Sequence, residues 1–218
     1  IKVTKYPMAS YDPKKLPFFP KVLRINGYET ACIGKWHLGE DVGHGRDWDY
    51  SVIWDRGSAN GRKNSNAYYH GTLVRTNGGP REPLGGYSND RFTEIAEEYV
   101  RKQVASPKPW FLWLCYPGVH GPYSPADRHL TDYADAPDAR VPLDIFGPRP
   151  TKPKHLKNLT RWKKDENGYP IGYEKIVKKY HRALLSLDDG VGSMLNALKE
   201  TDQLKNTVVI FTSDQGFA

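Results

Sequence analysis

The sequence predicts an α/β fold in which helices flank a mostly parallel β-sheet. Amphipathic stretches of helical period alternate along the chain with short apolar runs of strand length. One run, residues 110–116, is entirely apolar and aromatic, as expected of a strand buried on both faces of a parallel sheet. Polar residues follow three of the runs within a few positions, and ligands in such folds bind beyond the carboxyl ends of the strands. A functional site is therefore expected at that edge of the sheet.

Three helices are predicted from capping residues and hydrophobic periodicity. Pro20 suits the first turn of a short helix, and Gly27 suits the left-handed residue that ends it. Residues 88–90 form a cap before apolar residues at helical spacing, so a second helix is expected to run to about Val104. The longest helix is expected at residues 173–201, although two internal glycines weaken it.

Short strands are expected between and after these helices, separated by two long loops. Loops of such length in a compact domain are typical of functional segments. Strands are predicted at residues 30–33, 110–116 and 208–211. The loop at residues 40–87 is expected to contain two short strand pieces, at 50–54 and 68–75, and the second loop spans residues 117–172.

Composition excludes several classes of protein. The 218 residues suffice for one domain with a sizeable core, and 38% hydrophobic and 12% aromatic content indicates a globular rather than a disordered chain. The longest apolar runs have the length of strands, so no membrane span is expected. Cys32 and Cys115 both lie in apolar runs, which predicts two buried thiols rather than a disulfide framework.

Positive charge is concentrated in one segment. The chain carries a net charge of +7, and residues 149–182 hold 11 Lys/Arg against three acidic residues. Such a segment suits a polyanion, whether a sulfated glycan, nucleic acid or a membrane surface, and suits a solvated loop and helix face equally well. It also contains the glycosylation sequon Asn158-Leu159-Thr160, which matters only in a glycosylating compartment.

The candidate site residues follow the ends of three predicted strands. Lys35 and His37 leave the first strand together between glycines, and an ammonium beside an imidazole suits an anionic oxygen group. His120 follows the 110–116 run. Asp214 and Gln215 follow the last strand and offer hard oxygen donors of the kind Ca²⁺ or Mg²⁺ prefers. Singly these motifs also fit a surface turn, a structural histidine and an Asx-type turn; their shared sheet edge favours a site.

Together these residues resemble the formylglycine-dependent sulfatases of the alkaline-phosphatase-like superfamily. The resemblance implies an alkaline-phosphatase-like sandwich with a mostly parallel central sheet flanked by helices, incomplete at both ends. It also implies that residues 1–218 are the central part of a single catalytic domain. The motifs that carry it are Gly27-Tyr28-Glu29-Thr30, Gly34-Lys35-Trp36-His37-Leu38-Gly39, His120-Gly121-Pro122, Leu187-Asp188-Asp189-Gly190-Val191-Gly192 and Thr212-Ser213-Asp214-Gln215-Gly216.

The resemblance assigns roles to the candidate residues. Lys35 and His37 would bind the sulfate and stabilise charge around the nucleophile. His120 would contact the sulfate ester and assist departure of the alcohol. Asp214 and Gln215 would bind a divalent metal, Ca²⁺ by preference or Mg²⁺; Gln215 departs from the Asn or His that the family has there.

Other parts of the family pattern are absent from the 218 residues. The N-terminal Asp-Asp metal pair, the nucleophile motif whose Cys becomes formylglycine, and a C-terminal Lys all lie outside them. Cys115 is not that nucleophile, because Gly118 and Val119 stand where the motif has Ser and Arg. The chain alone is therefore expected to be inactive.

A sulfated small molecule or sulfated glycan is the expected partner, and no nucleic acid is expected. By resemblance the protein is periplasmic, secreted or lysosomal, whereas the oligomeric state is not readable. Two alternatives stay open. One is a phosphate or phosphonate ester hydrolase of the same superfamily, because tetrahedral oxyanions need similar donors. The other is a non-catalytic polyanion-binding module that uses the basic segment.

Overall fold

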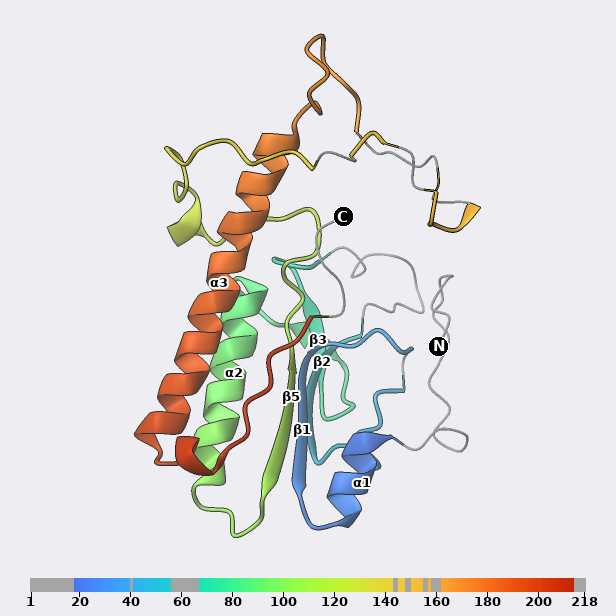
Figure 1. The fold of residues 1–218 in the computed structure, drawn as a ribbon. Helices are drawn as coiled ribbons and strands as arrows, with labels where there is room; N and C mark the ends of the chain where they lie inside the picture. The colour runs from blue at the N-terminus through green and yellow to red at the C-terminus, as the bar shows by residue number, and fades with distance from the viewer. Residues whose placement is uncertain are drawn as a thin grey trace. The chain divides into compact units, whose positions relative to one another are not determined.

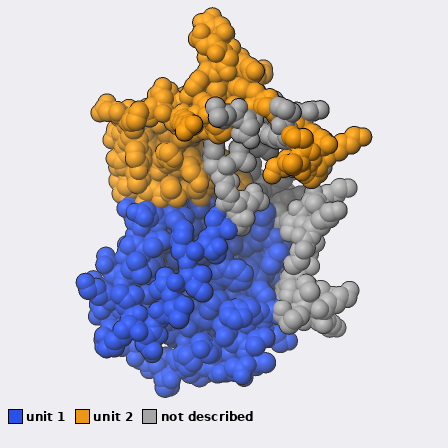
Figure 2. All heavy atoms as spheres, viewed as in Figure 1, with its two compact units in different colours: residues 1–118, 187–218 blue, residues 119–186 orange. Residues whose placement is uncertain are grey.

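The computed structural model describes two compact units. One comprises residues 1–118 and 187–218 and the other residues 119–186 (Figure 2). The predicted site residues Asp214 and Gln215 and the sequon at Asn158 lie outside the described residues. The residues described are 18–39, 41–55, 67–142, 145–147, 150–154, 157 and 162–213.

The first unit contains a five-stranded sheet in the order β4-β3-β2-β1-β5. Strand β1 is parallel to both of its neighbours, whereas β2, β3 and β4 are joined by antiparallel pairings. The carboxyl ends of β2, β1 and β5 therefore lie side by side, as the predicted mostly parallel sheet required. The strands are β1 (Glu29–Lys35), β2 (Tyr50–Trp54), β3 (Leu73–Thr76), β4 (Arg81–Pro83) and β5 (Trp110–Cys115).

Helices cover the two faces of this sheet. Helix α1 (Phe19–Ile25) lies on one face, and α2 (Ser88–Gln103) lies on the other together with the second half of α3 (Tyr173–Glu200) (Figure 1). The alternation along β5 agrees, because Leu112 packs against the α2–α3 core whereas Phe111 packs against α1. All three helices match their predicted positions, but the predicted side-chain cap of α2 is wrong: its N-cap is Tyr87, with no side-chain cap hydrogen bond.

A glycine lets α3 approach α2 closely. A Cβ at Gly190 would lie 2.6 Å from both Thr93 Oγ1 and the Tyr116 hydroxyl, which hydrogen-bond to each other at 2.7 Å. Gly192, two residues further along the helix, faces open space. The sequence indicated only that both glycines weaken the helix; the structure shows that Gly190 is required by packing.

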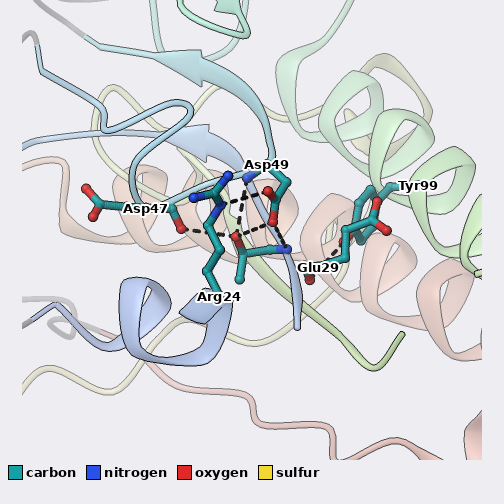
Figure 3. Close-up of polar contacts among 6 residues, drawn as sticks. Arg24, Glu29, Asp47, Asp49 and Tyr99 are labelled. Atoms are coloured by element: carbon teal, nitrogen blue, oxygen red, sulfur yellow. Dashed lines mark hydrogen bonds and ion pairs between the residues drawn. The ribbon is translucent and has the colours of Figure 1, made fainter. Parts of the chain in front are cut away.

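A polar network holds the amino end of β1 (Figure 3). The buried hydroxyl of Thr30 donates to the Asp47 carbonyl oxygen at 3.0 Å and lies 3.1 Å from Asp49 Oδ2. Arg24 Nε donates to Asp49 Oδ1 at 2.7 Å, which ties α1 to the same turn. Burial raises the pKa of Asp49, but hydrogen bonds from the Thr30 amide and Arg24 outweigh it and lower the pKa overall. The Tyr99 hydroxyl donates to the Glu29 carbonyl oxygen at 3.3 Å, so α2 joins the network.

Two strand predictions are wrong, and a third is wrong in its bounds: the strand expected at residues 68–75 is β3, Leu73–Thr76, with bends at residues 68–71. Residues 208–211 were expected to form a buried strand, yet in the described part of the chain no backbone hydrogen bond joins them to another segment, and their exposed fractions run from 52 to 87%. An apolar run becomes a strand only where a neighbouring strand completes its hydrogen bonds. The second wrong prediction concerns β5, which was expected to be buried on both faces. Among the described strands it pairs only with β1 and lies at the edge of the sheet, where Trp113 is 41% exposed and Cys115 is half-buried.

The second unit consists of loops packed on the first half of α3. Aromatic contacts fasten them to the helix: Tyr123 contacts Tyr180, Tyr133 contacts His181, and Trp162 contacts Tyr173. In neither unit is a described helix long and apolar enough to cross a membrane.

Candidate functional site

The end of β1 is shaped by a close approach to β5. Gly34 has φ +115°, and a Cβ placed there would lie 2.0 Å from the Cys115 carbonyl oxygen. Only glycine allows both this backbone conformation and this contact. The two strands therefore converge where β1 delivers Lys35.

Lys35 lies over an aromatic surface. Its Nζ is 5.2 Å from the centre of the Tyr68 ring, and that ring packs edge-on against Trp54 with 4.8 Å between centroids. The backbone of Tyr68 is also hydrogen-bonded to α2, because Ser88 Oγ at the start of that helix donates to the Tyr68 carbonyl oxygen at 2.5 Å. An ammonium over a ring face is attracted by the ring quadrupole, so this arrangement favours a charged and localised Lys35.

Trp36 separates Lys35 from His37. Its amide donates to the Trp54 carbonyl oxygen at 2.8 Å, which continues the β1–β2 register by one residue. Its side chain is buried in a cluster with Cys32 and Trp48. Because alternate residues of an extended chain point to opposite sides, burying Trp36 directs Lys35 and His37 to the other side together. The structure thus brings these two predicted residues to one strand end.

An acidic–basic cluster beside Lys35 was not predicted from the sequence. Asp55 directly follows β2, whose last residue Trp54 pairs with Lys35, and its carboxylate is 1% exposed. Arg75 Nε and Arg81 Nη2 donate to it at 3.0 and 2.8 Å. The three described residues of this cluster carry one negative and two positive charges, a net charge of +1. The same signal used for Lys35, a polar residue directly after an apolar run, identifies Asp55.

The end of β5 is clamped to α2. Asn89 is completely buried, and its Oδ1 accepts a hydrogen bond from the Gly118 amide at 3.2 Å. Desolvation in the same place raises the pKa of Tyr116 to about 12, so its hydroxyl stays neutral beside Thr93. This buried contact fixes the residues that lead out of β5.

His120 belongs to the second unit, and its distance from Lys35 therefore stays a prediction. It is exposed, and its Nδ1 lies 2.8 Å from the Gly121 carbonyl oxygen. A carbonyl oxygen can only accept, so Nδ1 carries the hydrogen in this bond.

The predicted metal ligands Asp214 and Gln215 are not tested, because both lie outside the described residues. Within the described ranges no group of three or more His, Cys, Asp or Glu residues is arranged to hold a metal ion. Of the two thiols, Cys32 is completely buried. Burial is the main cause that raises the pKa of Cys32, and the hydrogen bond with Cys115 is the second.

The structure thus shows an α/β fold in which Lys35 lies at the end of β1 and His37 follows it, and comparison with known proteins specifies the class of the protein. The family model described as Sulfatase matches residues 2–218, so the chain belongs to the sulfatase family.

Relatives of this chain are named as sulfatases. It is 29% identical over 206 residues to a putative extracellular sulfatase Sulf-1 homolog of Caenorhabditis elegans, a match covering 89% of the chain and 27% of that protein. It is 24% identical over 255 residues to an N-acetylglucosamine-6-O-sulfatase of Bacteroides thetaiotaomicron, covering 91% of the chain and 44% of that protein. The chain therefore spans less than half the length of these two relatives.

The solved structure of BT4656 in complex with its substrate D-glucosamine-2-N,6-O-disulfate has the same fold. It superposes with a TM-score of 0.67 at 19% identity, over 91% of this chain and 49% of that one. The predicted alkaline-phosphatase-like fold is thereby confirmed.

Proposed function

We propose that the protein containing this chain hydrolyses sulfate esters. The observation that carries the proposal is the end of β1, where Gly34, Lys35 and His37 belong to the most specific family motif. At this point Gly34 packs against Cys115 of β5, and Lys35 and His37 follow it as the two groups that can carry positive charge. Their positive charge suits a tetrahedral oxyanion, and the neighbouring cluster around Asp55 adds to it.

In this mechanism each side chain has a separate task. Lys35, fixed over Tyr68, binds a sulfate oxygen and neutralises charge that increases in the transition state. His37 donates a hydrogen bond to a neighbouring oxygen. His120, with Nδ1 satisfied by the Gly121 carbonyl, gives its Nε2 proton to the departing alcohol oxygen as the S–O bond breaks.

The remaining parts are assigned by the family resemblance. Asp214 and Gln215 would hold a divalent cation, Ca²⁺ or Mg²⁺, which when bound balances the charge of the sulfate. The attacking oxygen would come from a formylglycine in a segment that precedes Ile1, and residues 1–218 would be the central part of one catalytic domain.

A sulfated carbohydrate is the proposed substrate class. N-acetylglucosamine-6-O-sulfatase is among the named relatives, and BT4656 is described with a sulfated glucosamine as its substrate. One relative is named as extracellular, which supports a location outside the cytoplasm.

The test compares Lys35→Ala, His37→Ala and the control Lys108→Ala in the full-length enzyme. Lys108 is an exposed lysine between α2 and β5. Sulfate released from 4-nitrophenyl sulfate is measured by ion chromatography. Each site variant is expected to lower kcat by roughly 10²–10³-fold, the loss typical of a charge-stabilising donor, and the control is expected to match wild type. Site variants with wild-type rates would contradict the proposal.

The two alternatives give different results in the same experiment. A phosphate or phosphonate esterase would hydrolyse 4-nitrophenyl phosphate in preference to the sulfate. A polyanion-binding module would release neither product, and its salt-dependent glycan binding would survive both site substitutions.

A further inference from the structure

A second group of polar and aromatic residues lies in the unit formed by residues 119–186. This group does not contain His120 or any other residue given a role above. The turn containing Asp132 and Tyr133 packs against α3, where the Tyr133 ring meets the His181 ring at 5.9 Å between centroids and 64° between planes. Arg182 Nε donates to the Asp132 carbonyl oxygen at 2.5 Å. The turn is thus attached to two consecutive helix residues, and we name Tyr133, His181 and Arg182 the tyrosine–arginine corner.

Tyr133 adopts a backbone conformation that is unusual for its type. Its φ is +58°, in the left-handed region, where a bulky residue is rare and strained by about 1–3 kcal/mol. Glycine or asparagine would make the same turn at less cost. The tyrosine nevertheless keeps 43% of its surface in water. Burial alone therefore does not account for a tyrosine at this position.

Arg182 keeps its positive charge available. Its hydrogen bond goes to a backbone carbonyl, while the Asp132 carboxylate is engaged by His129 Nδ1 at 2.6 Å. Among the residues that the structure describes, no carboxylate forms an ion pair with Arg182. A guanidinium held by its Nε presents its remaining N–H groups as a rigid fork, the geometry that matches sulfate and carboxylate oxygens.

We propose that the tyrosine–arginine corner binds an anionic sugar residue of a sulfated glycan, other than the residue whose sulfate is hydrolysed. The flat face of Tyr133 stacks on the sugar ring, and Arg182 binds its sulfate group. A ring with an apolar face and a fixed cation beside it is the combination that an anionic carbohydrate requires. The stretch around Tyr133, residues 127–144, holds five Asp against two Arg, so Arg182 is the residue that supplies the positive charge of the corner. This inference rests on the proposed sulfatase function.

The test measures binding of a size-defined heparin tetrasaccharide to the full-length enzyme by isothermal titration calorimetry at about 0.15 M salt, an ionic strength that screens exposed charges. Tyr133→Ala and Arg182→Gln are each expected to weaken binding roughly tenfold, as for a lost charge-assisted or stacking contact. Arg182→Lys is expected to lose several-fold, because an ammonium lacks the fork. Lys179→Gln, the same charge change on an exposed residue of the same helix, is expected to bind as wild type.

Melting temperatures show whether the variants fold. Weaker tetrasaccharide binding by Tyr133→Ala and Arg182→Gln at an unchanged melting temperature supports the inference. A wild-type protein that does not bind the tetrasaccharide, or equal losses in Arg182→Gln and Lys179→Gln, overturns it. Hydrolysis of 4-nitrophenyl sulfate by the wild type is measured separately, so failure of the proposed function is distinguished from failure of the corner.

Discussion

Replacing Gly34 with alanine tests the convergence of β1 and β5 on which the candidate site depends. The new Cβ would lie 2.0 Å from the Cys115 carbonyl oxygen and 2.7 Å from its carbonyl carbon. Restoring van der Waals distance requires the strand ends to separate by more than about 1 Å. Overpacking of this kind costs roughly 1–3 kcal/mol, and a non-glycine residue at φ +115° adds about 1–3 kcal/mol of strain.

Gly27→Ala is the matched control. Gly27 also has a positive φ, +91°, but a Cβ at this position would have nothing within 4 Å of it. The variant therefore carries the strain of about 1–3 kcal/mol without the clash. Gly34→Ala is expected to lose roughly 1–3 kcal/mol more unfolding free energy than Gly27→Ala.

Urea unfolding followed by tryptophan fluorescence measures this difference from the transition midpoints. The full-length enzyme supplies a second measurement, because displacing Lys35 by about 1 Å is expected to lower kcat/KM on 4-nitrophenyl sulfate by roughly 10²-fold in Gly34→Ala only. Equal midpoints and equal rates for the two variants would refute the argument from close strand approach.

Three further predictions concern the packing around the sheet. Gly190→Ala is expected to lower the urea midpoint of unfolding, because its Cβ would lie 2.6 Å from Thr93 Oγ1. Gly192→Ala, whose Cβ would meet nothing, is expected to raise the free energy of unfolding by about 0.5–1 kcal/mol. Midpoints of the two variants that move in the same direction would contradict this. Thr30→Val should cost about 1–3 kcal/mol in urea unfolding, because its partners are left unsatisfied in a buried place; a loss below about 0.5 kcal/mol would show that water replaces the hydroxyl. The lowered pKa of Asp49 stabilises the fold at neutral pH, and this contribution should disappear as the pH falls below about 4 and through the lowered pKa, so Asp49→Asn should flatten the acid limb of a melting-temperature profile; an unchanged limb would contradict it.

Local features of this chain were predictable because their causes lie within a few residues. Pro20 and Gly27 bound α1 as expected, since a fixed φ and a left-handed residue act locally. Periodicity likewise placed α2 and α3 within one residue or so of their observed ends. The strand predicted at residues 30–33 is found as the slightly longer β1, Glu29–Lys35, because a short apolar run followed by a polar turn is also a local signal.

Features that depend on neighbours were not predictable. The run at residues 208–211 has the composition of a buried strand, but a strand also needs a partner for its backbone, and composition does not specify one. The role of Gly190 could not be read either, because its cause is the Thr93–Tyr116 hydrogen bond contributed by two other elements. The sequence pattern marks Asp55 as a polar residue after an apolar run, but it does not show its two arginine partners, which come from β3 and β4.

The sequence by itself thus determined the family, the α/β alternation and the residues Lys35, His37 and His120 as candidates, because motif order and periodicity are properties of the chain alone. Tertiary structure decided the contacts between residues that are distant in sequence. The ring of Tyr68 beneath Lys35, the contact at Gly34 and the tyrosine–arginine corner on α3 each join residues far apart in sequence. Such contacts arise only when the strands and helices pack, so no local pattern records them.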